Sequence, residues 1–520
     1  MSDPDVADAW LALWQGITSL ESLDATWLNI ATTLLSFCAQ SQPPPDAWRG
    51  LAAGEPSSSI LSVEASATAD LMAVDPDLFA PPVDDDNTDD TAAFSFASPA
   101  HVQALHLRAE AELANGAIDD PRLAHIIVAR GLAGAIDNLI GRTYVTWFKN
   151  LGEVRLTEGK AYPVRAHDPR AWLGRHPANS NPATLPTRDL AWSHRLRIAG
   201  RSQFNYVIDF EMWNRLSPIG AENGLILAIA QPNFHFGEFD IRWYTDDRRT
   251  YANRGPKDAV TQAQRITKLV ETAAANGAEI ILMPEYTLTE DVRDTVRQHL
   301  STHSTRPLLL CVGISGNADS DNYVSNEAWL LAVTPEMECT YSPPHCAAKM
   351  YGARTDGHDE RIRTASDVRV FMSENWTLAT LICRDAMDTN ILRQLAILGT
   401  NLLLVPAMSE KTTTMVGSIS ELCHTSQAFV VMANGPAAWR DPTLTQLPER
   451  VFTQSFAEPV SVDRSANPDP DRYEGFAAGP YANTPSGFSL PPGDDPRPTN
   501  ELGLWLFNAG EKVVTPVQIQ

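Results

Sequence analysis

The chain has 520 residues, of which 43% are hydrophobic, and it carries a formal net charge of −24 at pH 7. A chain of this length and composition predicts two or three domains, each with enough apolar residues for a packed core. The strong negative charge argues against a protein that binds nucleic acids or anionic membranes over its general surface.

Residues 1–222 predict a mainly helical accessory domain. Apolar residues recur at helical spacing in the first 40 residues, and two Ala-rich helical patterns follow at residues 101–115 and 121–140. No catalytic motif occurs in this part of the sequence. Assembly or the binding of a protein partner is therefore its expected role.

One part of this region has a different composition. Residues 40–99 are rich in Pro, Ser, Ala and Asp, and they include an acidic run at residues 84–90. Such a composition buries too little apolar surface to offset the entropy of ordering the chain. We therefore expect a mobile acidic segment near residues 40–99.

Residues 223–520 predict a second domain, in which strand-like runs alternate with helical patterns. The first apolar run covers residues 224–232, and residues 259–275 place apolar side chains on one helical face before Gly277 ends the helix. Further buried strands are expected at residues 308–314, 328–333, 399–406, 428–434 and 502–507. Alternation of this kind is typical of an α/β fold. Residues 441–498, rich in Pro, Gly, Asp and Asn, are expected to form long loops.

Three side chains suited to one reaction lie in or directly after strand-like runs of this second domain, namely Glu285, Lys349 and Cys383. The carbon of an amide or nitrile is a weak electrophile, so its attack needs a strong nucleophile such as a thiolate. A carboxylate can take the thiol proton, and an ammonium can stabilise the negative charge that develops in the intermediate. Each residue alone has a simpler explanation, as a buried cysteine, a turn glutamate and a surface lysine.

The order and context of these three residues resemble the Glu, Lys, Cys triad of the nitrilase or carbon-nitrogen hydrolase superfamily. The resemblance runs from about residue 224 to residue 520. It implies a four-layer α-β-β-α sandwich, in which two sheets pack face to face with helices outside. It also implies a hydrolase that cleaves a non-peptide carbon–nitrogen bond through a Cys383 thioester, with an amide favoured over a nitrile. Members usually form dimers or larger homo-oligomers, and the substrate is a small molecule.

The resemblance also indicates supporting residues. The backbone N–H of Arg384 would be a second donor to the negative charge of the intermediate, and Asn434, at the end of a strand, would help to shape the site. Many members carry a second glutamate after the lysine, and Glu360 is the nearest candidate. Asp356 and Asp359 are alternatives for that role, and a charged turn explains the same residues equally well. A turn role explains Asn434 as well.

The turn at Cys383 is expected to favour the thiolate. An apolar run precedes Cys383, and apolar residues at helical spacing follow it up to Gly399. This pattern predicts a strand, a sharp turn and a helix, with the sulfur near the positive helix end.

No cofactor or metal is expected. The sequence contains neither a phosphate loop nor a dinucleotide fingerprint, and the cluster of Cys339, His345 and Cys346 lacks a fourth zinc ligand. Six cysteines without tight pairing favour a reducing compartment. With no signal-peptide pattern and no long apolar run, the sequence predicts a cytoplasmic protein without a membrane span.

A second functional hypothesis stays open at this point. The protein could be a regulatory or scaffold protein that keeps a hydrolase-like domain for assembly, while residues 1–222 bind a protein partner. The large unassigned first region favours this alternative, and the complete set of Glu285, Lys349 and Cys383 argues against it.

Overall fold

The computed structural model describes residues 3–20, 27–41, 55–76, 97–116, 118–156, 161–162, 194–195, 204–220, 225–233, 236–244, 249–303, 306–333, 346–355, 357–373, 376–409, 412–426, 428–436, 475–478, 487–490, 502–508, 513–517 and 519. The chain divides into two compact units. The first comprises Met1–Asp168 with His176–Gly200, and the second comprises Pro169–Arg175 with Arg201–Gln520. Within the described ranges, no helix has the length and apolarity needed to cross a membrane.

Helices dominate the described part of the first unit. They are α1 (Asp3–Thr18), α2 (Trp27–Gln40), α4 (Glu55–Val74), α5 (Pro99–Ala114) and α6 (Pro121–Leu151). The short strands of this unit are β1 (Glu153–Arg155), β2 (Ala161–Tyr162) and β3 (His194–Arg195). The long helix α6 packs against α2 and α4, and the shared core includes Trp10, Trp27, Leu34 and Ile126.

Helix α4 corrects the expectation of a mobile segment over residues 40–99. Ile60, Val63, Ala67 and Leu71 recur at helical spacing and are buried against the rest of the bundle. A Cβ at Gly131 would lie 2.6 Å from the Cβ of Val63, so this glycine permits the close approach of α6 to α4. The many Ser and Ala residues concealed a helix whose apolar side chains are small. The acidic run at residues 84–90 lies outside the described residues.

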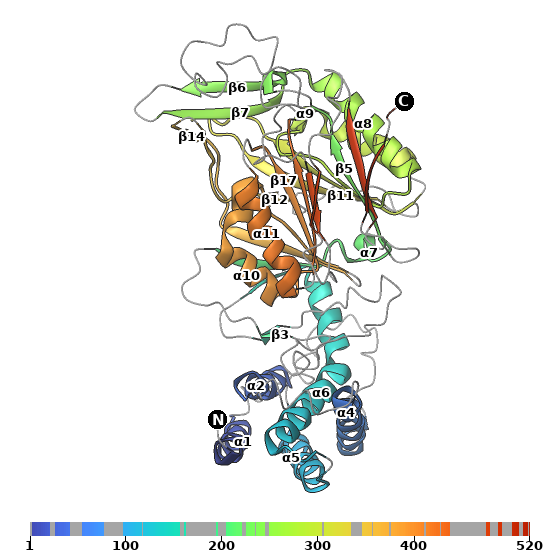
Figure 1. Ribbon diagram of the computed structural model, residues 1–520, viewed down its shortest axis with the longest axis vertical. Helices are drawn as coiled ribbons and strands as arrows, with labels where there is room; N and C mark the ends of the chain where they lie inside the picture. Colours follow the sequence, from blue (N-terminus) through green and yellow to red (C-terminus); the bar gives the residue numbers. More distant parts are fainter. Residues whose placement is uncertain are drawn as a thin grey trace. The chain divides into compact units, whose positions relative to one another are not determined.

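The second unit is a mixed α/β structure built on two large sheets (Figure 1). In one sheet the strands of this unit lie in the order β4 (Asn205–Asp209), β15 (Asp367–Met372), β16 (Thr377–Thr380), β17 (Leu402–Ala407), β18 (Phe429–Asn434), β19 (Gly475–Ala478) and β20 (Gly487–Leu490). The other sheet has the order β12 (Cys346–Ala348), β11 (Asn326–Val333), β10 (Leu308–Ser315), β8 (Ile280–Leu282), β5 (Ile226–Gln231), β21 (Gly503–Asn508) and β22 (Val513–Pro516), with β9 (Leu288–Thr289) beside β10.

The two sheets contact each other, and helices lie against both. Strands β17 and β18 pack against β5, β8 and β10. Helices α8 (Ala259–Ala275) and α9 (Glu290–His303) share a core with the sheet that contains β10. Helices α10 (Thr389–Ile397) and α11 (Thr413–Ser426) pack together, and α11 lies against β18 and β19. The short helix α7 (Trp213–Leu216) contacts β11 and β15.

A smaller third sheet was not expected. It has the order β13 (Arg354–Thr355), β14 (His358–Glu360), β7 (Thr250–Pro256) and β6 (Phe239–Tyr244), and the 3-10 turn η5 (Phe236–Glu238) precedes β6. Figure 1 shows β6, β7 and β14 side by side. This sheet matters for function, because it carries Glu360 and several side chains of the cavity described below.

The boundary of the second unit lies earlier than residue 223. Strand β4, at residues 205–209, pairs in parallel with β15 and thus belongs to a large sheet of this unit. The helix expected at residues 259–275 is confirmed as α8, and Gly277 has a positive φ of 85° at its end. The five further strands expected from apolar runs are confirmed as β10, β11, β17, β18 and β21, with ends that differ by up to three residues. The expected loop region at residues 441–498 contains strands β19 and β20, and its other residues lie outside the described ranges.

Candidate active site

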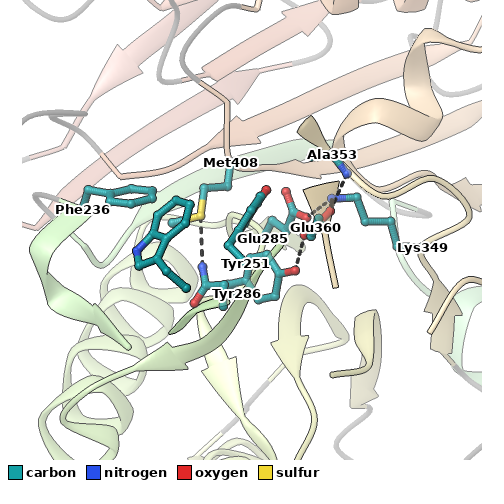
Figure 2. A pocket seen from close by; sticks show the side chains of 10 residues that line it. Phe236, Tyr251, Glu285, Tyr286, Lys349, Ala353, Glu360 and Met408 are labelled. Carbon is teal, nitrogen blue, oxygen red and sulfur yellow. Dashed lines mark hydrogen bonds and ion pairs between the residues drawn. The ribbon is translucent and has the colours of Figure 1, made fainter. Parts of the chain in front are cut away.

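A buried lysine bridges two buried carboxylates in the second unit. The Nζ atom of Lys349 donates hydrogen bonds to Glu285 Oε1 at 2.6 Å and to Glu360 Oε2 at 2.8 Å. Each of these three side chains is only 1% exposed. The structure therefore brings together Glu285, Lys349 and Glu360 around one cavity, as Figure 2 shows.

The sheet that contains β10 determines where Glu285 and Lys349 lie, whereas Glu360 belongs to β14 of the third sheet. Glu285 follows β8, and Lys349 follows β12, whose neighbour β11 pairs with β10. The backbone N–H of Lys349 also donates to the Asn326 carbonyl at 2.8 Å. On β10, a Cβ at Gly313 would lie 2.4 Å from the Cα of Glu285, so only glycine fits at this position. The position of Glu285 thus depends on a close approach of two backbones.

Three further residues hold the carboxylates in place. Asn326 Nδ2 donates to Glu285 Oε1 at 2.6 Å and lies 3.4 Å from Glu360 Oε1. The Tyr286 hydroxyl donates to Glu360 Oε1, and the backbone N–H of Ala353 donates to Glu360 Oε2 at 2.6 Å. Sequence reasoning missed Asn326, which lies at the start of β11, two residues before the expected strand. It also left Tyr286 unassigned, although this residue directly follows Glu285.

Burial and the nearby charges set the protonation of this cluster. Burial raises the pKa of Glu285 above its usual 4.5, Lys349 opposes that shift, and Glu360 adds to it. Burial disfavours the ammonium of Lys349, but the carboxylates outweigh this effect and hold its pKa well above the usual value. Burial and Glu360 raise the pKa of Tyr286, so its hydroxyl stays neutral and can donate. A raised carboxyl pKa suits a group that exchanges protons near neutral pH.

Cys383 is the first residue of the 3-10 turn η6 (Cys383–Met387), and two residues separate it from the end of β16. Its φ is +49°, a left-handed conformation that is uncommon for a residue with a side chain. Tyr286, next to Glu285, has a φ of +61°. Backbone strain of this kind is often found at functional sites. The sharp turn expected at Cys383 is therefore present.

The helix expected after Cys383 is present, but the cysteine does not lie at its end, and the expected resting state of the thiol is wrong. Helix α10 begins at Thr389 with Asp388 as its N-cap, so η6 separates the sulfur from the helix end. Burial and the charge of Glu285 raise the pKa of the Cys383 thiol, while Lys349 and a hydrogen bond to the Met408 carbonyl lower it. The thiol is therefore protonated at rest and needs a base before it can attack.

Asp385 joins the cysteine turn to the lysine segment. Its carboxylate accepts the backbone N–H groups of Met350 at 3.0 Å and Tyr351 at 2.8 Å, directly after Lys349. Asp385 is buried, and burial raises its pKa to about 7 although both N–H donors favour the carboxylate. Asp385 thus anchors the turn that carries Cys383 to the segment after Lys349.

The remaining predicted residues have different surroundings. The Arg384 guanidinium is exposed and donates to the Gly352 carbonyl at 2.7 Å. Asn434 accepts the Ser409 N–H at 2.8 Å and donates to the Ser409 carbonyl at 3.0 Å, which holds the segment beside Met408. Asp359 is exposed and lies 3.7 Å from Arg354, away from the cluster. Asp356, the other alternative to Glu360, lies outside the described residues.

The cavity together with its opening to solvent encloses about 350 Å³. Its lining residues come from segments of the two large sheets and of the small third sheet. They are Phe236, Trp243, Tyr251, Asn253, Glu285, Tyr286, Lys349, Ala353, Glu360 and Met408. Cys383 adjoins this lining through Met408, because Sγ lies 3.9 Å from the Met408 carbonyl oxygen. Cys383 itself is not among the lining residues, so this contact with Met408 is its described connection to the cavity.

The donor set does not suggest a metal site. In the part of the chain that the structure describes, no three His, Cys, Asp or Glu side chains are grouped to hold a metal ion. The three charged groups that line the cavity instead bind one another. Two members of the other cluster considered from the sequence, Cys339 and His345, lie outside the described residues.

Comparisons with known proteins find similarity at the level of structure. No protein-family model and no curated protein sequence matches the chain. Among solved structures, the glutamine-dependent NAD+ synthetase from Acinetobacter baumannii aligns with a TM-score of 0.35 and 15% identity, over 57% of this chain and 48% of the synthetase. An amidase from Nesterenkonia sp. aligns with a TM-score of 0.35 and 16% identity, over 56% of this chain and 90% of the amidase.

A carbon-nitrogen hydrolase from Helicobacter pylori aligns with a TM-score of 0.30 and 10% identity, over 40% of this chain and 73% of the hydrolase. The chain spans about half the length of the synthetase. At such TM-scores and identities the similarity does not establish an activity, which is inferred from the residues of the site.

Proposed function

We propose that this protein is a thiol-dependent hydrolase that cleaves a non-peptide carbon–nitrogen bond, with an amide favoured over a nitrile. Cys383 is the nucleophile, Glu285 the general base and Lys349 the group that stabilises negative charge in the intermediate. The observation that carries this proposal is the buried Lys349 ammonium, 2.6 Å from Glu285 and 2.8 Å from Glu360. A buried charge cluster of this kind is costly to maintain, and such clusters are frequent at catalytic sites.

The first half of the reaction forms a thioester. Both hydrogen bonds described for the Glu285 carboxylate reach Oε1, so Oε2 is the oxygen assigned to take the Cys383 proton. The thiolate attacks the amide carbon, and the oxygen anion is stabilised by Lys349 and the backbone N–H of Arg384. When the carbon–nitrogen bond breaks, Glu285 returns the proton to the leaving nitrogen. Ammonia or an amine departs, and the acyl group stays on the sulfur.

The second half releases the acid. Glu285 takes a proton from a water molecule, the resulting hydroxide attacks the thioester, and the cysteine leaves as a thiolate that recovers the proton from Glu285. Glu360 keeps Lys349 in place through both halves. Removing one donor to an anionic intermediate costs about 2.7–4 kcal/mol of barrier in well-studied enzymes. Lys349 is therefore expected to affect kcat more than KM.

The fold and assembly that accompany this function are part of the proposal. The contact of β17 and β18 with β5, β8 and β10, with helices against both sheets, supports a four-layer α-β-β-α sandwich for the second unit. We propose that the protein forms a homo-oligomer, and that the helical first unit acts in assembly or in binding a protein partner. Size-exclusion chromatography with light scattering tests the oligomeric state.

The test of the activity is ammonia release from a panel of small amides, carbamoyl compounds and nitriles. We expect release from at least one amide, and loss of that release in Cys383→Ala. Cys423→Ala is the matched control, because Cys423 is also buried but lies on α11 away from the cavity lining. Equal activity of Cys383→Ala and the wild type would overturn the proposal. Loss of activity in both cysteine variants would show a folding effect instead, and alkylation of Cys383 by acrylamide in the wild type would then decide.

A further inference from the structure

One wall of the cavity is aromatic and is supplied by the small third sheet. Phe236 of η5 and Tyr251 of β7 line it, and Met408, after β17, completes the apolar surface (Figure 2). Trp243 of β6 belongs to the same lining. Trp243 and Tyr251 are register partners on the paired strands, with ring centroids 5.2 Å apart. The ring of Trp243 also meets that of His358 edge-on at 5.2 Å. The rings are therefore held by strand pairing and by packing.

The charged lining of the cavity carries an excess of negative charge. Among the described lining residues, the charged groups are the carboxylates of Glu285 and Glu360 and the ammonium of Lys349. Lys349 contacts both carboxylates, so its charge is already compensated. A substrate carboxylate placed here would meet one net negative charge in a buried site, and it would find no further cation in that lining. Like charges at short range in a poorly solvated site repel strongly.

From these two observations we infer that the site takes amides with an uncharged, apolar acyl group and rejects amides whose acyl group carries a carboxylate. This inference rests on the proposed function and adds a substrate class to it. Phe236, Trp243 and Tyr251 determine the preference for an apolar group, because they bury it without needing a polar partner. Glu360 contributes to the exclusion of anions.

The direct test compares butyramide with succinamate, which have the same number of carbon atoms but differ in the charge at the far end. We expect kcat/KM for butyramide to exceed that for succinamate by at least about tenfold, which corresponds to roughly 1.4 kcal/mol. A smaller ratio would overturn the inference and leave the hydrolase proposal intact. Absence of ammonia from every compound of the panel, with no adduct on Cys383, would overturn both.

Two variants locate the selectivity, and each is judged from a ratio of substrates so that a general loss of activity cancels. Glu360→Gln removes one negative charge, so the ratio of butyramide to succinamate is expected to fall. Trp243→Ala removes part of the apolar wall, so the ratio of butyramide to acetamide is expected to fall. Tyr244→Ala is the matched control, because Tyr244 is the next residue of β6 and does not line the cavity. Unchanged ratios in both site variants would contradict the assignment of these residues.

Discussion

The carboxylate of Asp385 accepts the backbone N–H of Tyr351 at 2.8 Å and thereby ties the cysteine turn to the lysine segment. The second carboxylate oxygen accepts the N–H of Met350 at 3.0 Å. Lys349 directly precedes Met350, and Cys383 lies two residues before Asp385. The two residues that must act on the same substrate are thus both close to this hydrogen-bonded connection. Their relative position follows from a single buried side chain, although 33 residues separate them in the sequence.

Asp385→Asn should weaken this connection. An amide offers one acceptor oxygen where the carboxylate offers two, so one buried N–H group loses its partner, at a cost of about 1–3 kcal/mol in unfolding free energy. The alkylation rate of Cys383 by acrylamide should fall as well, because the thiol is displaced from its base. Urea unfolding and mass spectrometry measure the two effects. Asp258→Asn is the control, since Asp258 is the exposed N-cap of helix α8 and asparagine caps a helix as well as aspartate does; equal behaviour of the two variants would contradict this role of Asp385.

Lys349→Met should leave Glu285 and Glu360 as buried carboxylates without their shared cation. Removing one partner of a buried ion pair typically costs about 3–5 kcal/mol. Because Lys349 lowers the pKa of Glu285, its loss raises that pKa further. A carboxyl with a raised pKa in the folded state destabilises the fold as pH rises from its unfolded pKa to its folded pKa.

The stability deficit of Lys349→Met relative to the wild type should therefore grow from acidic to neutral pH. Chemical unfolding at several pH values measures it. The double variant with Glu360→Gln should recover part of the loss, since one of the two carboxylates is then neutral. A deficit that is the same at all pH values would argue against ionised carboxylates at this position.

The acid limb of kcat/KM should move in Glu360→Gln. Glu285 must be ionised to take the thiol proton, and both burial and the charge of Glu360 raise its pKa above 4.5. Removing the charge of Glu360 lowers the pKa of Glu285, so activity should persist to lower pH than in the wild type. Asp359→Asn, an exposed neighbour on β14, should leave the acid limb unchanged. A shift to higher pH in Glu360→Gln would contradict the assignment of the base.

Gly313→Ala should displace the base. Its Cβ would lie 2.4 Å from the Cα of Glu285 and 2.6 Å from the Pro284 carbonyl oxygen, and neither backbone atom can rotate away. Such overpacking typically costs about 1–3 kcal/mol in stability, and a loss of at least about tenfold in kcat is expected from the misplaced carboxylate. Gly417→Ala on α11 is the control, because no atom lies within 4 Å of its Cβ. Equal kcat values for the two variants would show that this approach does not position Glu285.

The sequence predicted β5, β10, β11, β17, β18 and β21 from their apolar runs, and it drew attention to Glu285, Lys349 and Cys383, which lie in or after strand-like segments. It did not reveal the small third sheet. Strands β6 and β7 contain Asp240, Arg242, Asn253 and Arg254, so their apolar signal is interrupted, and their role becomes visible only through pairing with β14.

The support for the site also depends on contacts between distant residues. Asn326 lies 41 positions after Glu285 in the sequence, and nothing in its local sequence indicates their hydrogen bond. The resting state of Cys383 depends on burial, which a local pattern of strand, turn and helix does not report. Helix α10 was expected from its apolar spacing, but the local sequence did not reveal that the 3-10 turn η6 separates it from Cys383.

The most direct test of the central claim is rapid-quench mass spectrometry of the protein mixed with an amide that it hydrolyses. The proposed mechanism predicts a transient mass increase equal to the acyl group, located on the peptide that contains Cys383, and absent in both Cys383→Ala and Glu285→Gln. Ammonia release without an acyl adduct on that peptide, or release at the wild-type rate by Cys383→Ala, would contradict the account.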